Sequence, residues 1–251
     1  NWSGYELLGI RNKPPGTDFD VQLDYLGERG FGHGGTFTYD VPDLFGIPGR
    51  TSGLATYWGI QDQGLDNLGQ DRSAVPPEKD YRFRLFWQHR QLLPADLQLS
   101  AELGWISDRN FLEEYFKGEW EELKDQSTGL ELKRYIENRS WSITADYRLN
   151  EFFTQTNWLP RFDHFWIGQS LFNDTLTWHE HSSLAYGQFR HTDVPENVTM
   201  FPSPPNPVGA AGPFNYLPWE QYEVQGGRFS TRQEIDWPFQ LGAVKVVPYL
   251  L

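Results

Sequence analysis

Polar and apolar residues alternate with a period of two along much of this chain. The longest clean run is 141–149, and the segments 19–25 and 97–103 alternate in the same way. Successive side chains of a β-strand point to opposite faces of its sheet, so each run predicts a strand with one apolar and one polar face. The run 81–85 alternates too, until Phe86 interrupts its polar face.

Two weaker runs, 176–188 and 222–235, extend the same pattern towards the end of the chain. Turn-forming residues separate the runs, as in 12–16 and 92–96, which contain Pro together with Gly or Asp. The order of strand, short turn, strand and longer loop is typical of consecutive antiparallel hairpins. The pattern therefore predicts an all-β fold of antiparallel hairpins connected by long loops.

One segment departs from the strand period and predicts a short helix or a loop with a helical turn. Its apolar residues recur at helical spacing, with glutamates between them. These apolar residues are Phe111, Leu112, Tyr115, Phe116, Trp120 and Leu123. We expect Ser107 or Asp108 to cap this helix. The segment 194–218, rich in Pro, Gly and Asn, predicts a long loop.

The composition separates two all-β architectures. Aromatic residues make up 16% of the chain against 38% for all hydrophobic residues, so aromatic rings supply much of the apolar surface. This balance suits a soluble sugar-binding sandwich, and equally a membrane barrel with aromatic girdles. Asp, Glu, Arg and Gln are dense on the polar faces, and aromatic residues recur at strand ends. Both features favour a transmembrane β-barrel. The strand-end aromatics are Tyr25, Tyr39, Trp105, Trp141 and Tyr147.

Charge and composition exclude several other classes. The net charge of −13 argues against nucleic-acid binding, and the absence of cysteine excludes disulfides and thiolate metal sites. No stretch approaches the ~18–20 apolar residues of a transmembrane helix. The chain begins with Asn1 and ends in the apolar segment 246–251. We expect 1–251 to be a segment of a larger outer-membrane barrel.

Candidate reaction chemistry is sparse. His179 and His181 flank Glu180, and on a strand both histidines would face one side, about 7 Å apart. A zinc site needs a third ligand, which the sequence does not reveal, so polar residues on a barrel's inner face explain the trio better. The glycines of 30–35 resemble a phosphate loop, but 36–39 predicts a strand where a nucleotide site needs a helix. We expect no catalytic residues, no metal and no cofactor.

Several stretches, taken in order, resemble one family, the LPS-assembly outer-membrane protein LptD (organic solvent tolerance protein). The first is 24–39, in which an Arg29-Gly30 turn joins two strands. The second is 106–115, which contains Ser107-Asp108. The later landmarks are Trp158-Leu159-Pro160, Gly227-Arg228-Phe229, Trp237-Pro238 and Val247-Pro248.

The resemblance implies a large antiparallel barrel in the bacterial outer membrane. Such a barrel receives lipopolysaccharide from periplasmic bridge proteins and releases it sideways into the outer leaflet, with a plug lipoprotein of the LptE type in its lumen. No bond is made or broken, so the resemblance implies no catalysis. The periplasmic jelly-roll domain that precedes such barrels is not present in this chain, and the cysteines of some members are missing.

The polar face of the run that begins at residue 81 carries Arg82 and Arg84, and Arg90 follows on the same face. These arginines are candidates to bind glycolipid phosphates, since guanidinium groups bind phosphate bidentately. Pairing with Asp and Glu of neighbouring strands is the alternative. Two other functions stay open: a secreted aromatic-rich β-sandwich that binds or hydrolyses polysaccharide, and a porin-like or uptake barrel.

Overall fold

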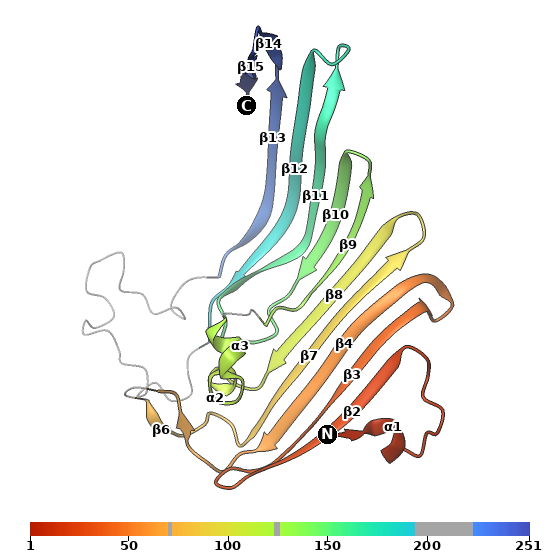
Figure 1. Cartoon of the computed structure of the whole chain (residues 1–251). Helices are drawn as coiled ribbons and strands as arrows, with labels where there is room; N and C mark the ends of the chain where they lie inside the picture. The colour runs from red at the N-terminus through yellow and green to blue at the C-terminus, as the bar shows by residue number, and fades with distance from the viewer. Residues whose placement is uncertain (70–71, 123–125, 194–222) are drawn as a thin grey trace, which may run out of the picture.

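The computed structural model describes residues 1–69, 72–122, 126–193 and 223–251, and in these the fold is all-β (Figure 1). One large sheet of twelve strands dominates, accompanied by two small two-stranded sheets. In order across it, the large sheet contains β1 (Trp2–Ser3), β2 (Thr17–Leu26), β3 (Gly30–Leu44), β4 (Ile47–Gln61), β7 (Tyr81–Leu93), β8 (Leu97–Ile106), β9 (Gly129–Ile136), β10 (Arg139–Asp146), β11 (Gln155–Leu171), β12 (Leu176–Arg190), β13 (Gln225–Asp236) and β16 (Tyr249–Leu250).

The remaining elements are short. One small sheet pairs β5 (Asp66–Asn67) with β6 (Ser73–Val75), and the other pairs β14 (Phe239–Leu241) with β15 (Val244–Val246). The helices are α1 (Gly4–Leu7), α2 (Phe111–Tyr115) and α3 (Lys117–Glu121). None of the helices in the described ranges is long and apolar enough to cross a membrane.

Neighbouring strands of the large sheet run antiparallel. From β2 to β13, the strands of this sheet follow one another across the sheet in the same order as along the chain. The prediction of an all-β fold built from consecutive antiparallel hairpins is therefore confirmed. The sheet is open within the described residues: β1 and β16 form its two ends and do not pair with each other. Figure 1 shows it as one continuous, twisting layer.

Most predicted strands lie where the alternation placed them. The runs 19–25 and 97–103 fall within β2 and β8, and 176–188 falls within β12. The run 81–85 opens β7, which continues to Leu93, so the turn predicted from residue 92 begins only after that strand.

The strand predicted over 141–149 is too long. β10 ends at Asp146, and one further hydrogen bond, from the Tyr147 N–H to the Thr128 carbonyl at 2.9 Å, follows before the chain leaves the sheet. The run predicted from Tyr222 begins in the structure at Gln225; Tyr222 itself lies outside the described residues, as does the predicted loop 194–218.

The helical segment is present but divided. Phe116 separates α2 from α3 with an extended φ of −131°, so the two helices do not form one. The expected cap is wrong: Asn110 precedes the first turn of α2, whereas Asp108 Oδ1 accepts a hydrogen bond from the Asn110 N–H at 3.1 Å. Leu123, the last apolar position of the pattern, lies outside the described residues.

The two edges at which strands turn differ in the length of their connections (Figure 1). At one edge, which we call the short-turn edge, hairpins close over 45–46, 94–96, 137–138 and 172–175, and the longer connections 4–16 and 237–248, which join the terminal strands β1 and β16 to the sheet, also lie there. At the opposite edge, which we call the long-loop edge, the connections are 27–29, 62–80, 107–128, 147–154 and 191–224. Only the first of these five is as brief as the turns of the opposite edge.

One face of the large sheet is mainly apolar and uncovered, although the ion pair of His164 with Glu180 also lies on it. A row of apolar side chains crosses six strands through directly paired positions: Leu99, Leu132, Ile143, Phe162, Leu184 and Phe229. In this row Leu184 is 59% exposed and Phe229 is 70% exposed. A soluble protein would bury such a face against a second layer, because apolar surface is costly in water.

The opposite, polar face holds the buried part of the molecule. A small apolar core of Ile106, Phe111 and Leu112 forms where α2 packs on this face. Asn150, in the connection after β10, accepts from the Ile106 N–H at 3.0 Å and donates to the Gly104 carbonyl at 2.8 Å. The connection 147–154 is thus fastened to β8.

Candidate functional site

A buried group of charged residues lies at the long-loop edge of the polar face. We call it the Arg82 cluster, and its members are Arg29, Asp62, Asp66, Arg82, Asp108, Glu114 and Tyr115. Arg82, the second residue of β7, is 0% exposed. Its guanidinium group donates to both carboxylate oxygens of Asp108, at 3.0 and 2.9 Å, and to Asp62 at 3.0 Å and Asp66 at 2.6 Å.

Arg29 enters the cluster from the turn between β2 and β3. It donates to Asp62 at 2.9 Å, to the Tyr115 hydroxyl at 3.1 Å and to Glu114 at 2.6 Å. The Tyr115 hydroxyl in turn donates to Asp62 at 2.6 Å. The cluster therefore joins the connections 27–29, 62–80 and 107–128 to one another.

The turn that presents Arg29 depends on Gly30. This residue has φ +125°, which L side chains rarely adopt, and an added Cβ would lie 2.7 Å from the Gln61 carbonyl oxygen. Only glycine lets β3 approach the end of β4 this closely while the preceding residue turns inward. The Arg29-Gly30 pair of the family resemblance thus has a structural reason in this chain.

Aromatic rings cover the cluster on the side of α2. The Arg82 guanidinium lies 5.2 Å from the ring centre of Tyr115 and 5.9 Å from that of Phe111. Arg84, two residues along β7, donates to both carboxylate oxygens of Glu119 at 2.7 Å, and its guanidinium lies 5.1 Å from the ring centre of Phe86. Phe86 interrupts the polar alternation of β7 because it supports this buried ion pair.

The cluster holds Asp62 in its charged form. Burial alone would raise the pKa of Asp62, but hydrogen bonds from Tyr115, the Gly64 N–H and Arg82, with the charge of Arg29, bring that pKa below its ordinary value of 3.8. A carboxyl group whose pKa is lowered by folding adds stability above its unfolded pKa. This stability is lost as the pH falls through the folded pKa.

We therefore expect the loops to loosen in acid, below about pH 3.8. The loss amounts to at most about 1.4 kcal/mol per pH unit for one proton. Pepsin, which is active in acid, should leave the 107–122 segment intact at pH 5 and cut it faster at each lower pH. Asp62→Asn removes the charge at every pH, so this variant should be cut already at pH 5. Identical cleavage profiles for the two proteins would contradict the assignment.

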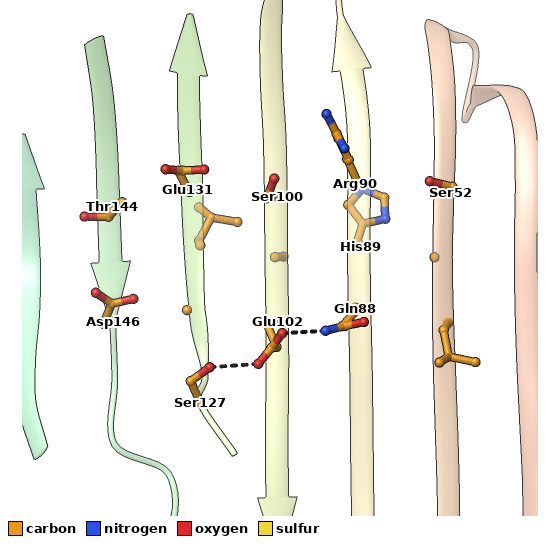
Figure 2. A pocket seen from close by; sticks show the side chains of 15 residues that line it. Ser52, Gln88, His89, Arg90, Ser100, Glu102, Ser127, Glu131, Thr144 and Asp146 are labelled. Atoms are coloured by element: carbon orange, nitrogen blue, oxygen red, sulfur yellow. Dashed lines mark hydrogen bonds between the residues drawn. The ribbon is translucent and has the colours of Figure 1, made fainter. Parts of the chain in front are cut away.

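A polar groove of about 490 Å³ lies beside the cluster on the same face, where β4, β7, β8, β9 and β10 run side by side (Figure 2). Its polar side chains come from all five strands and from the segment before β9. They are Ser52, Gln88, Arg90, Ser100, Glu102, Ser127, Glu131, Thr144 and Asp146. Glu102 is held at the centre, because Gln88 and Ser127 each donate to it at 2.7 Å.

The groove presents hydroxyl, amide, carboxylate and guanidinium groups together. Such a mixture suits a hydrated, hydroxyl-rich ligand such as a sugar, which both donates and accepts hydrogen bonds. Among the described residues, no group of three or more His, Cys, Asp or Glu is placed to hold a metal ion.

The three arginines singled out from the sequence have different surroundings. Arg82 and Arg84 are buried in ion pairs with carboxylates, and these carboxylates come from the connections 62–80 and 107–128 and not from the strands beside β7. Arg90 lines the polar groove, is exposed and donates to Gln98 at 3.0 Å. Contact with glycolipid phosphates stays a prediction, and Arg90 is the arginine of this set that faces open space.

The motif residues of the family resemblance separate into two groups. Arg29, Ser107 and Asp108 meet at the Arg82 cluster, where the Ser107 hydroxyl donates to Asp108 at 2.7 Å. The others lie elsewhere. Leu159 and Pro160 are joined by a cis peptide at a bulge in β11, and Arg228 is an exposed residue of β13. Pro238 lies between β13 and β14, and the Pro248 carbonyl accepts from the Trp237 N–H at 2.9 Å.

The two histidines with metal-like spacing share one face of β12, as expected. His179 lies 3.4 Å from Asp236, and His181 lies 3.1 Å from Asp163 and stacks on Phe165 with ring centres 4.0 Å apart. Each histidine thus faces a separate carboxylate. The glycines of 30–35 lie within β3, with the strand continuing through 36–39.

Sequence reasoning missed Asp62, Asp66 and Tyr115 as partners of Arg82, and Glu114 as the partner of Arg29. Their only common signal is position, since all four lie in the connections at the long-loop edge. No family model matches the chain, and no curated protein matches its sequence.

Proposed function

We propose that this chain forms part of a β-barrel in the bacterial outer membrane, and that the barrel serves lipopolysaccharide assembly. The observation that supports a place in the membrane is that the apolar face of the sheet is uncovered, whereas its polar face is the one that holds buried residues. Its uncovered face is apolar across six strands, while its polar face holds buried ion pairs. A lipid bilayer is the surrounding that stabilises an apolar outer face and leaves a polar face for a wet interior.

The two edges of the sheet support the same orientation. Outer-membrane barrels have short periplasmic turns and longer extracellular loops, with aromatic girdles at both interfaces. Aromatic residues lie on the apolar face near the long-loop edge, where the rings of Tyr25 and Phe31 are 4.8 Å apart. Nearer the short-turn edge, the rings of Trp166 and Trp178 are 5.3 Å apart. We place the long-loop edge on the cell surface.

The lipopolysaccharide part of the proposal is supported by the resemblance to the LptD family and by the polar groove. A glycolipid has a sugar headgroup that needs hydrogen bonds and acyl chains that need lipid. The groove offers hydrogen-bonding groups on the inner face, and the apolar face lies in the bilayer. We propose that plug lipoprotein, periplasmic bridge proteins and outer-membrane lipid are the partners of the complete barrel.

The packing of the long loops favours this proposal over an open porin. The helices α2 and α3 lie over the polar face at the long-loop edge, fastened there by the Arg82 cluster and by the Arg84–Glu119 ion pair. They narrow the interior that a porin keeps open. A β-sandwich needs a second large sheet on the apolar face, whereas the other sheets in the described ranges have two strands each.

Depletion of the protein from cells tests the proposal as a whole. We expect the protein to sediment with outer membranes and to require detergent for extraction, and its depletion to lower surface lipopolysaccharide. Recovery of the protein in the soluble fraction without detergent would refute the barrel. Unchanged surface lipopolysaccharide in depleted cells would leave the barrel standing and refute the assembly role.

A photo-crosslinking amino acid placed on either face of β8 tests which face meets the cargo. Ser100 lines the polar groove, and Leu99, one residue earlier, lies on the apolar face. With p-benzoylphenylalanine at position 100, we expect lipopolysaccharide adducts in growing cells. The same probe at position 99 should instead capture bulk membrane lipid. Equal lipopolysaccharide adducts at both positions would contradict transport along the polar face.

A further inference from the structure

The apolar face is not flat: a groove of about 370 Å³ opens between β2, β3, β4 and β7. Its apolar lining comes from Phe19, Val21, Phe37, Ala55 and Leu85. Gly35 lies at its centre, where an added Cβ would stand 2.8 Å from the Asp20 carbonyl oxygen and 3.4 Å from the Phe19 ring. The groove exists because small residues, Gly35 and Ala55, stand where neighbouring positions carry aromatic rings.

Three polar side-chain tips meet at the end of this groove nearest the long-loop edge. His33 Nε2 lies 3.4 Å from the Tyr57 hydroxyl and 3.3 Å from the Tyr81 hydroxyl, and the two hydroxyls hydrogen-bond to each other. They meet above Gly59, where an added Cβ would lie 2.6 Å from the Tyr57 hydroxyl and 2.8 Å from that of Tyr81. A side chain at position 59 would separate them.

An apolar groove that ends in hydrogen-bonding groups matches the two parts of a lipid. An acyl chain gains little from leaving bulk lipid for an apolar groove, because both surroundings are equally apolar. The preference for one lipid must then come from its headgroup, since hydrogen bonds strengthen where water is scarce. Tyrosine at a membrane interface has this double character, an apolar ring and a polar tip.

We propose that this groove, with His33, Tyr57 and Tyr81, binds one glycolipid molecule of the outer leaflet from the bilayer side. An acyl chain occupies the groove, and headgroup oxygens hydrogen-bond to the imidazole and the two hydroxyls. The site is separate from the polar groove, which lies on the opposite face of the same sheet. The assignment rests on the proposed function, because it places the long-loop edge, and hence the three polar tips, at the outer leaflet.

Native mass spectrometry of the detergent-purified protein tests the site, with lipid A, phosphatidylglycerol and phosphatidylethanolamine added at equal concentrations. We expect the wild type to retain one lipid A in preference to either phospholipid. Ala55→Phe fills the groove, and the double variant Tyr57→Phe with Tyr81→Phe removes both hydroxyls. Each change should lower lipid A retention about tenfold, the equivalent of one lost hydrogen bond or one blocked contact.

Ala145→Phe is the matched control, because Ala145 pairs with Leu130 on the same apolar face, away from the groove. It should retain lipid A like the wild type. Equal retention of the three lipids by the wild type, or undiminished retention by both groove variants, would overturn the assignment. Heat-dependent migration in gels shows that each variant is folded. A protein that is soluble without detergent refutes the proposed function itself, whereas an inserted protein that retains no lipid A refutes this site alone.

Discussion

Replacing Arg82 with alanine is expected to lower the free energy of unfolding by about 3–5 kcal/mol, the usual cost of removing one partner from a buried ion pair. The reason is that the substitution leaves three buried carboxylates with one guanidinium donor fewer. Asp62, Asp66 and Asp108 are each 4% exposed or less, and each loses a guanidinium donor. Arg29 still pairs with Asp62 and Asp66, but the described contacts give Asp108 no other cation.

Urea unfolding of the detergent-solubilised protein, followed by tryptophan fluorescence, measures this loss. Arg90→Ala is the matched control, because Arg90 is on the same face of the same strand but exposed. That change should alter stability by no more than about 0.5 kcal/mol. Equal stability of the two variants would show that the Arg82 cluster does not hold the loops in place.

A double-mutant cycle separates the ion pair from other effects of truncation. Asp108→Ala combined with Arg82→Ala should cost clearly less than the sum of the two single changes, since each single change alone already removes the interaction between them. The coupling is expected to reach at least about 1 kcal/mol for side chains joined by two hydrogen bonds at 3.0 and 2.9 Å. Strict additivity would contradict a direct pairing.

The second large effect concerns the apolar face. Leu184→Arg is expected to destabilise the protein in a bilayer by about 2–4 kcal/mol, the cost of an arginine near the membrane midplane of a barrel. In water the same change would cost almost nothing, because Leu184 is 59% exposed. The result therefore distinguishes a lipid-facing strand from an ordinary surface strand.

Ser183→Arg is the control for this prediction. Ser183 is the preceding residue of β12 and points to the polar face, where it pairs with Asp163 across the neighbouring strand. An arginine there gains a carboxylate neighbour, so its effect should be small. Folding yield into vesicles and urea midpoints compare the two variants. Tolerance of Leu184→Arg equal to that of Ser183→Arg would argue against a lipid-facing surface.

Alternation predicted β2, β7, β8, β10, β12 and β13, but no run was assigned to β9 or β11. It was less informative for β3 and β4, where Gly32 and Gly34 leave gaps and Trp58 and Ile60 put apolar side chains on the polar face. Trp58 lies beneath α2, where its ring contacts that of Tyr115 with centres 4.9 Å apart, and Ile60 is 0% exposed. Alternation fails where a loop returns to cover the sheet, because local periodicity carries no information about that return.

The candidate sites could not be predicted for the same reason, because their residues come from segments that are far apart in the chain. Arg82 and Asp108 were both singled out, but their pairing depends on the register between β7 and β8 and on the course of the following connection. The apolar-face groove depends on Gly35 and Ala55 coming beside Phe19 and Leu85 from other strands. The sequence shows which residues lie along one strand. Which residues of different strands meet in a cluster depends on the register between those strands.

The hairpin order of the large sheet also has a consequence for how the protein is assembled. Each strand finds its partner nearby in the chain, so the sheet can grow one hairpin at a time without waiting for distant segments. The Arg82 cluster is different, since the ion pair of Arg29 with Glu114 spans 85 residues. It can close only after β2 through β8 are all in register. The cluster therefore depends on the first half of the sheet and on none of the hairpins that follow it.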